Sequence, residues 1–285
     1  MEISDGAVRI LAGLLTARTG QQLSVGRRWR IEAALRPLMA EHAAPSLDLL
    51  VGKIVSGEHP RLADEAIEAL LNHETFFYRD IAAFRQLEAQ GLMRLHAARA
   101  ATKRLRVWSA GCSTGQETYT LAMMFADRPD RWAGWTIDIL GTDLSPVAVA
   151  RARAGRYSQF EIQRGLPVTQ MLRRFDQQGD EWQASSGLRD AARFRVHNLL
   201  GVPPVGLFDV VLCRNVLLYF SADVRGLVFG RIASAMPDDG LLMLGAGETV
   251  IGHTDRFVSD YECRGCYRKR IDEPRSNAIH GADPR

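Results

Sequence analysis

Two acidic residues stand where a protein could hold a nucleoside. Glu117 follows the glycine-containing segment 110–115 (AGCSTG) after one residue, and Asp143 comes just after a second short apolar segment. A loop that runs into a helix directs backbone N–H groups at a ligand, and an acid at the end of the next strand can accept hydrogen bonds from both ribose hydroxyls. Segment 110–115 also fits an ordinary strand-to-helix turn, and Asp143 also fits a helix cap near Ser145. Taken together, the loop and the acid predict a nucleoside-binding site.

The residues at the start of the helix distinguish between two kinds of nucleoside ligand. The loop matches neither the dinucleotide pattern G-x-G-x-x-G nor the phosphate-binding pattern G-x-x-x-x-G-K-[ST]. Gln116 and Glu117 follow it directly. Because a carboxylate repels a pyrophosphate and attracts an ammonium group, Glu117 favours the methionine part of S-adenosylmethionine. These residues therefore predict S-adenosylmethionine as the cofactor.

Alternating strands and helices are needed to position these residues. Short, bounded apolar runs predict buried strands, and the segments between them are typical of helices. The predicted strands are 105–109, 137–141, 208–213 and 241–245, and the predicted helices are 118–126, 146–154 and 222–236. Ser145 suits a helix N-cap, with Pro146 at the first helical position. The alternation indicates an α/β fold with a parallel, doubly wound, Rossmann-like sheet.

Two regions depart from this alternation. Residues 1–73 space their apolar side chains at three and four, which predicts a small all-helical N-terminal domain. Residues 156–192 contain Gly179-Asp180 and Ser185-Ser186-Gly187, two turn signals that predict a small antiparallel β insertion. The predicted boundaries are 1–73 for the helical domain, 74–271 for the α/β domain with its insertion at 156–192, and 272–285 for a disordered polar tail.

Composition and charge narrow the class of protein further. The 285 residues are 46% hydrophobic, which supports a packed core rather than disorder. Lys and Arg total 36 against 33 Asp and Glu, a balance too even to indicate a nucleic-acid-binding protein. The N-terminus lacks the features of a signal peptide, and no run approaches the roughly 20 apolar residues of a membrane helix. These features predict a soluble, cytoplasmic protein.

The four cysteines do not indicate a disulfide framework or a metal site. They are Cys112, Cys213, Cys263 and Cys266. The spacing Cys263-x-x-Cys266 occurs in redox and zinc sites, but the chain has no second ligand pair at a zinc spacing. Segment 257–269 instead predicts a terminal strand. Packing is therefore the favoured interpretation of this pair.

Four segments resemble, in order along the chain, the motifs of the CheR-type chemotaxis receptor methyltransferases. Segment 108–119 (WSAGCSTGQETY) resembles S-[AC]-x-S-T-G-[QE]-E-P-Y-[ST], with Thr118 in place of the proline. Segment 75–80 (TFFYRD) is similar to T-x-F-F-R-D, and segment 213–220 (CRNVLLYF) resembles C-R-N-V-[LM]-I-Y-F. Segment 244–250 (LGAGETV) is similar to L-G-x-x-E. Several motifs in one order are more specific than any single one.

The resemblance implies an activity and a role for each matched residue. The implied enzyme is a protein-glutamate O-methyltransferase, which methylates glutamate side chains of a chemoreceptor, a methyl-accepting chemotaxis protein, and leaves S-adenosylhomocysteine. In the implied site, Thr75 and Arg79 hold the methionine carboxylate and Glu117 holds its ammonium. Asp143 holds the ribose, and Asn198 and Leu199 frame the adenine. Arg214 and Asn215 close the pocket, and Tyr219 lies near the sulfonium methyl. His73 takes the place of a family asparagine and is counted among the cofactor-binding residues. Arg79 and Tyr219 are the implied catalytic residues.

A carboxylate acceptor would need no general base. Its pKa of about 4.3 leaves it ionised at neutral pH, so alignment with the sulfonium methyl is the main requirement. Arg79 would orient the anion and Tyr219 would polarise the site, although each taken alone also fits an ordinary surface or core-edge residue. Enzymes that methylate amines or adenine commonly carry an [ND]-P-P-[YF] stretch. Segment 213–220 occupies that place here, which favours a carboxylate acceptor.

The implied partner is the helical cytoplasmic domain of a chemoreceptor. In the family a basic N-terminal helix is thought to meet acidic receptor helices. Here Arg27, Arg28, Arg30 and Arg36 lie on the helix predicted around segment 31–39. They do not form one stripe on a helical wheel, so an ordinary solvated face is an equal alternative. The protein is expected to be a monomer.

Two other functions remain open at this point. One is a methyltransferase for a small carboxylic acid, which the N-terminal helical region disfavours because a small substrate needs no docking surface. The other is a non-catalytic module that binds S-adenosylmethionine, which the complete set of site residues disfavours. The sequence does not identify the receptor, the pathway it serves, or whether the β insertion docks a receptor tail.

Overall fold

The computed structural model describes residues 4–23 and 28–271 of the chain. The tail expected to be disordered, 272–285, and Arg27 lie outside the described residues, as does the side chain of Arg28. Among the described residues, no helix combines the length and the apolar character needed to span a bilayer.

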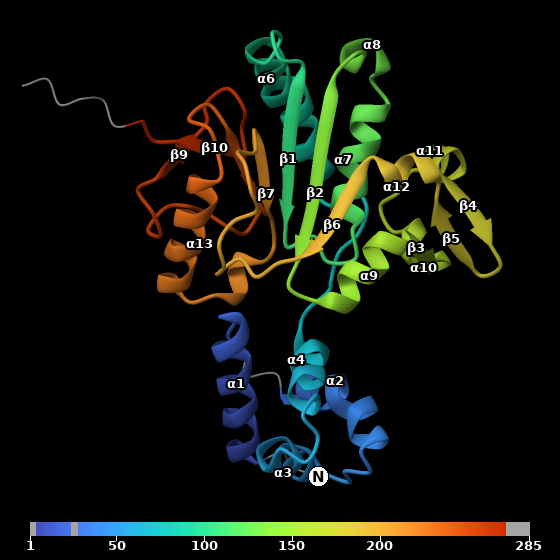
Figure 1. Cartoon of the computed structure of the whole chain (residues 1–285), viewed down its shortest axis with the longest axis vertical. Helices are drawn as coiled ribbons and strands as arrows, with labels where there is room; N and C mark the ends of the chain where they lie inside the picture. Colours follow the sequence, from blue (N-terminus) through green and yellow to red (C-terminus); the bar gives the residue numbers. More distant parts are fainter. Residues whose placement is uncertain (1–3, 24–27, 272–285) are drawn as a thin grey trace, which may run out of the picture.

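A seven-stranded sheet in the order β6-β2-β1-β7-β8-β10-β9 forms the centre of the larger part of the molecule (Figure 1). Its strands are β1 Arg104–Ala110, β2 Thr136–Asp143, β6 Ala192–Val196, β7 Val210–Cys213, β8 Leu241–Leu244, β9 Phe257–Ser259 and β10 Cys266–Lys269. Strands β6, β2, β1, β7 and β8 pair in parallel, whereas β10 runs antiparallel to both of its neighbours. The predicted Rossmann-like α/β fold is confirmed, with an antiparallel hairpin at one edge.

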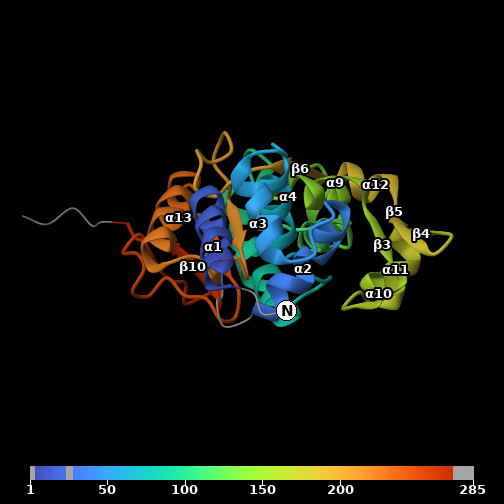
Figure 2. The ribbon, with the colours of Figure 1, turned by 90° about the horizontal axis from the view of Figure 1, so that it is seen from below.

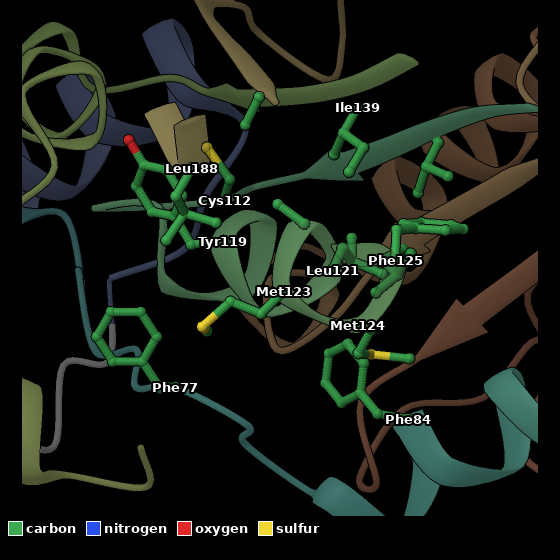
Figure 3. Packing of buried hydrophobic residues seen from close by; sticks show 14 of the residues in the cluster. Phe77, Phe84, Cys112, Tyr119, Leu121, Met123, Met124, Phe125, Ile139 and Leu188 are labelled. Atoms are coloured by element: carbon green, nitrogen blue, oxygen red, sulfur yellow. The ribbon is translucent and has the colours of Figure 1, made fainter. Parts of the chain in front are cut away.

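Helices cover both faces of this sheet because successive strand residues point to opposite sides. Leu105 and Val107 of β1 belong to a buried cluster that includes side chains of α5, α6 and α7, while Trp108 and Ala110 belong to a cluster that includes α13. Figure 3 shows the first cluster, in which side chains of α7 lie beside Phe84. The helices around the sheet are α5 Ile81–Gln86, the π-helical turn η2 Leu87–Gly91, α6 Leu92–Ala98, α7 Gln116–Ala126, α8 Pro129–Trp132, α9 Pro146–Ala154, the 3-10 turn η3 Leu217–Tyr219 and α13 Ala222–Ser234.

Four N-terminal helices form a separate cluster with its own apolar core. They are α1 Asp5–Thr19, α2 Arg28–Glu41, α3 Leu47–Ser56 and α4 Leu62–Leu70. Leu11, Leu35, Leu50 and Leu62 are among the side chains buried there. In Figure 1 the carboxyl ends of β1, β2 and β6 point toward these helices, and Figure 2 shows the helices from that side, lying across the middle of the molecule. The helical N-terminal region expected from the sequence is therefore present and faces the edge of the sheet where ligands bind in α/β proteins.

The β insertion is also present, with one of its two predicted turns. Strands β3 Arg156–Ser158, β4 Phe175–Gln178 and β5 Glu181–Ala184 form an antiparallel sheet in the order β3-β5-β4, accompanied by α10 Gln159–Gln163 and α11 Val168–Arg174. Gly179-Asp180 joins β4 to β5 as predicted. The turn predicted at Ser185-Ser186-Gly187 is wrong, because α12 Ser186–Asp190 begins there. Ser185 caps this helix by accepting a hydrogen bond from the backbone N–H of Leu188.

Two strand assignments also need correction. Segment 257–269 does not form one terminal strand, because β9 and β10 are separated by a turn in which the Asp260 carboxylate accepts the backbone N–H groups of Glu262 and Cys263. Strand β6 was not predicted, although it pairs with β2 along five residues. Its sequence ARFRV buries only Ala192 and Phe194, so the strand has little of the apolar run that marks its neighbours.

Candidate active site

An open pocket with about 680 Å³ of empty space lies between the carboxyl ends of the parallel strands and the segment that follows α4. Most of the predicted site residues line it, namely His73, Thr75, Arg79, Glu117, Asp143, Arg214, Asn215 and Tyr219. Asn198 and Leu199 line a neighbouring hollow that shares Asp143 and Gly111 with the pocket. The fold thus gathers residues that are widely separated along the chain at one edge of the sheet.

The loop after β1 and the end of β2 hold each other through Asp143. One carboxylate oxygen of Asp143 accepts the backbone N–H of Ser113 at 2.7 Å, and the other accepts the backbone N–H of Ser145 at 3.0 Å. Ser145 also caps α9 through its hydroxyl, which accepts the N–H of Ala148 at 2.9 Å. Each carboxylate oxygen has further lone pairs. Asp143 is therefore held in place at the pocket wall while it can still accept hydrogen bonds from a ligand.

The backbone around the pocket adopts conformations that most residues avoid. Gly115 has a φ of 95°, and a Cβ there would lie 2.9 Å from the Cβ of Ala152, so only glycine fits this turn. The non-glycine residues with positive φ near the pocket are Tyr78 (52°), Asp80 (58°), Ser113 (50°) and Asn215 (59°). Such conformations cost energy and cluster at sites where the surrounding structure holds them.

A buried arginine links the two sides of the pocket. The side chain of Arg214 is only 1% exposed, and it donates to Glu117 at 3.0 Å, to Asp80 at 2.7 Å and to the backbone carbonyl of Arg79 at 3.0 Å. Glu117 also accepts the hydroxyl of Ser109 at 2.8 Å. Because one positive charge is shared between two carboxylates, the group keeps a net negative charge. That charge suits the ammonium of a methionine moiety.

Arg79 presents the opposite charge to the same pocket. Its guanidinium donates to the backbone carbonyl of Glu74 at 3.0 Å and lies 5.5 Å from the ring centre of Phe76. Among residues 4–23 and 28–271, no carboxylate forms an ion pair with it; its charge helps to lower the pKa of the Glu74 carboxyl, but Glu74 forms its ion pair with Arg164. The preceding Tyr78 is half-buried, and burial together with the charge of Asp127 raises the pKa of Tyr78 to about 12. Arg79 is thus available to an anion in the pocket.

Tyr219 and Asn72 form the wall of the pocket that faces the N-terminal helices. The amide of Asn72 donates a hydrogen bond to the hydroxyl of Tyr219. The backbone of Tyr219 is held as well, because its carbonyl accepts the N–H of Gln22 at 2.7 Å. Gln21 next to it lines both the pocket and the neighbouring hollow. The segment after α1 therefore contributes to the site directly.

His73 lies at the edge of the pocket, and its contacts differ from those of a side-chain amide such as that of the family asparagine it replaces. Its backbone carbonyl accepts the hydroxyl of Ser113 at 3.0 Å, which ties the segment after α4 to the loop after β1. Its imidazole Nε2 is 3.7 Å from a carboxylate oxygen of Glu68 on α4. Asn72, the neighbouring residue, supplies the amide on this segment.

The hollow beside Asp143 is formed with help from the first helix. Asn198 donates to the backbone carbonyl of Arg18 at 3.2 Å and accepts the N–H of Leu200 at 2.9 Å, so both ends of its amide are engaged. Thr19, at the end of α1, lines the same hollow as Leu199. Asn198 therefore shapes the wall by holding α1 against the loop after β6.

Glu248 was quoted within a motif but received no role from the sequence. Its carboxylate accepts four backbone N–H groups: those of Asn215 at 2.7 Å and Gly245 at 2.9 Å on one oxygen, and those of Leu217 at 2.8 Å and Leu218 at 3.3 Å on the other. This holds the loop after β7 in the conformation that brings Asn215 and Tyr219 to the pocket. Asp80 was missed in the same way, as the last residue of the segment TFFYRD, whereas nothing in the sequence pointed to Gln21.

The arrangement fits S-adenosylmethionine. Opposite charges at Glu117 and Arg79 suit the ammonium and the carboxylate of the methionine part, and the Asp143 acid lies between them and the apolar hollow beside Leu199. S-adenosylmethionine joins an amino acid, a ribose and a base in that order. The pocket offers Glu117 and Arg79, then Asp143, then the hollow beside Leu199 in the same order.

Comparison with known proteins decides the family. A family model described as "CheR methyltransferase, SAM binding domain" matches residues 73–262, about two thirds of the chain. The chain belongs to the CheR methyltransferase family. The chemotaxis protein methyltransferase of Vibrio anguillarum is 33% identical over 260 residues, which cover 90% of this chain and 93% of that protein. Chemotaxis protein methyltransferase 1 of Pseudomonas aeruginosa is 32% identical over 262 residues, covering 90% of this chain and 95% of that protein.

Membership of the CheR family agrees with the resemblance seen in the sequence motifs. The chain is an S-adenosylmethionine-dependent methyltransferase of the chemotaxis type. The family match begins at His73 and ends at Glu262, so it includes the pocket segments after β1, β2 and β7 and, from His73 onward, the segment after α4. The cofactor predicted from Glu117 and Asp143 is the cofactor of this family.

Proposed function

We propose that this CheR-family enzyme methylates glutamate side chains on the helical cytoplasmic domain of a chemoreceptor, forming methyl esters and S-adenosylhomocysteine. The observation that carries the proposal is Arg79, a cation of the pocket lining that forms no ion pair with a carboxylate of the described residues, because the nearby Glu74 is paired with Arg164. A cation in this position favours an anionic acceptor over an amine, because it attracts a carboxylate and would raise the energy of the methylammonium cation that an amine becomes on methylation.

The other polar groups of the pocket support an acceptor that needs no base. Glu117 is engaged by Arg214, and Asp143 is engaged by two backbone N–H groups. The imidazole of His73 faces Glu68 on α4. A glutamate carboxylate is already ionised at neutral pH, so these engaged groups would not have to accept a proton from it.

Each residue of the pocket has a proposed task. Bound S-adenosylmethionine would supply the electrophilic methyl group of its sulfonium. Thr75 and Arg79 would bind the methionine carboxylate, Glu117 the ammonium, Asp143 the ribose hydroxyls, and Asn198 and Leu199 the adenine face, while Arg214 and Asn215 would close the pocket beside His73. Tyr219, held by Asn72, would donate a hydrogen bond from its hydroxyl to the acceptor carboxylate and orient it. Arg79 has five N–H donors, and those that the methionine carboxylate leaves free would orient the acceptor anion toward the methyl, so that alignment lowers the barrier.

The domain organisation belongs to the same proposal. Residues 1–73 would form a helical receptor-facing domain, and residues 74–271 the catalytic domain with its β insertion at 156–192. Arg30 and Arg36 on α2 are exposed and would meet an acidic receptor surface. A monomer acting in the cytoplasm is sufficient for this activity, since every proposed site residue comes from one chain.

The test is methylation of a receptor cytoplasmic fragment with tritiated S-adenosylmethionine, followed by treatment with base. Methyl esters release volatile tritiated methanol in base, whereas methylated amines retain the label. Arg79→Lys keeps the charge but not the planar guanidinium, so it should retain part of the activity, and Arg79→Met should lose most of it. Base-stable label would contradict a glutamate acceptor. Label transferred only to small carboxylic acids, or cofactor binding without any transfer, would support one of the two other functions.

A further inference from the structure

Five residues form a circuit of contacts beside the pocket, and hydrogen bonds make all of its links except one. The Ser145 hydroxyl donates to the carboxylate of Glu68, and the Ser145 backbone N–H donates to Asp143 at 3.0 Å. Asp143 accepts the N–H of Ser113 at 2.7 Å, and the Ser113 hydroxyl donates to the carbonyl of His73 at 3.0 Å. The remaining link is longer than a hydrogen bond, with the imidazole Nε2 of His73 lying 3.7 Å from the carboxylate of Glu68. The circuit joins α4, the segment after it, the loop after β1 and the start of α9.

Glu68 is the one member of this circuit that belongs to the N-terminal helices. Its side chain is 23% exposed, and it reaches from α4 to Ser145, which is fully buried. Glu65, one turn earlier on α4, instead faces His42 at 3.6 Å within the helical cluster. Glu65 therefore makes its contact inside the helical cluster, whereas Glu68 makes its contact with Ser145 at the start of α9.

We propose that Glu68 is a positioning residue that holds Asp143 in its ribose-binding geometry through Ser145. The proposal rests on the role of Asp143 given under the proposed function. It also ties the placement of α4 to the occupancy of the cofactor site.

The hydroxyl of Ser145 explains how Glu68 acts at a distance. This hydroxyl has one proton and two lone pairs. Glu68 takes the proton, which leaves a lone pair directed at the N–H of Ala148 as the cap of α9. Without Glu68 the proton would be buried without an acceptor, which is costly. The Ser145 side chain would then turn about its Cα–Cβ bond toward another acceptor, which would break its cap on Ala148 and loosen the backbone whose N–H holds Asp143.

The consequence is a coupling between two sites. The binding of ligand hydroxyls to Asp143 depends on the same circuit as the contact between α4 and Ser145. Ligand binding and this contact should therefore stabilise each other by the same free energy. A chemoreceptor that shifts α4 would therefore change cofactor affinity, and bound cofactor would favour the seated position of α4.

The test compares Glu68→Ala, Glu68→Gln and the control Glu65→Ala by calorimetric titration of the full chain with S-adenosylhomocysteine. Glu68→Ala should weaken binding about three- to tenfold, the effect expected for one lost hydrogen bond. Glu68→Gln keeps an oxygen for Ser145 and should bind within about twofold of wild type. Glu65→Ala should bind as wild type does. Wild-type affinity in Glu68→Ala, or equal weakness in Glu68→Gln and Glu68→Ala, would overturn the proposal.

A second ligand separates positioning from a general loss of structure. The analogue of S-adenosylhomocysteine that lacks both ribose hydroxyls cannot use Asp143, so Glu68→Ala should bind it as tightly as wild type does. Equal weakening for both ligands would overturn the proposal. Asp143→Asn provides the remaining distinction. If it leaves S-adenosylhomocysteine binding unchanged, the proposed role of Asp143 fails, whereas if it weakens binding and Glu68→Ala does not, only the positioning role fails.

Discussion

Replacing Glu248 with glutamine should destabilise the protein and loosen the cofactor site together. The substitution keeps the shape of the side chain but turns one of its two acceptor oxygens into a donor. Both oxygens now accept two backbone N–H groups each. Either orientation of the amide would therefore set an NH₂ group against two N–H donors, and the loop after β7 would have to move.

The magnitude follows from the four distances. The less costly orientation places the amide nitrogen against Leu217 and Leu218, because the Leu218 N–H is the most distant at 3.3 Å. Hydrogen bonds to a charged acceptor contribute about 1.5–3 kcal/mol each. The loss of one good and one weak bond should lower the free energy of unfolding by about 3 kcal/mol. The retained oxygen keeps Asn215 in place, so cofactor binding should weaken less, by about tenfold.

Urea unfolding followed by circular dichroism measures the first effect, and titration with S-adenosylhomocysteine measures the second. Glu262→Gln is the matched control, because that carboxylate is 73% exposed and its side chain pairs with Arg94 at the surface. Its free energy of unfolding should stay within about 0.5 kcal/mol of wild type. If Glu248→Gln is as stable as this control, the four hydrogen bonds do not hold the loop and the reasoning fails.

Three further predictions address the pocket and its surroundings. Asp143→Ala should weaken S-adenosylmethionine binding about ten- to a hundredfold, from the loss of roughly 1.5–3 kcal/mol, and an unchanged dissociation constant in calorimetry would remove Asp143 from the site. The rate of single-turnover methylation should not change between about pH 6 and 8 in wild type or in His73→Asn, since the acceptor is already ionised. A rate that rises tenfold per pH unit in wild type alone would identify His73 as a base. The raised pKa of Tyr78, about 12, means that stability is lost as the pH rises from about 10 toward 12. Tyr78→Phe should therefore show a shallower fall in the free energy of unfolding over that range, and equal slopes would contradict this.

Elements encoded by neighbouring residues were predictable from the sequence. Helix α9 begins and ends where Ser145, Pro146 and the apolar spacing place it. The strands β1, β2, β7 and β8 were recognised from their bounded apolar runs, and the alternation with helices predicted the Rossmann-like sheet. Glu117 and Asp143 followed from the same logic, since loops after parallel strands meet at one edge, whereas the other candidate site residues came from the family resemblance. Strand β6 escaped this reasoning because only two of its five residues are buried.

The tertiary structure alone decided how distant segments support that site. Glu248 meets the loop of Asn215 because β7 and β8 are neighbours in the sheet, and Glu68 meets Ser145 because α4 is seated against the start of α9. Apolar spacing and helix caps act within a turn or two of chain, so one sequence displays them. A carboxylate that accepts N–H groups from a remote loop leaves no local pattern. Its partner is set by strand order and helix packing, which exist only once the chain has folded.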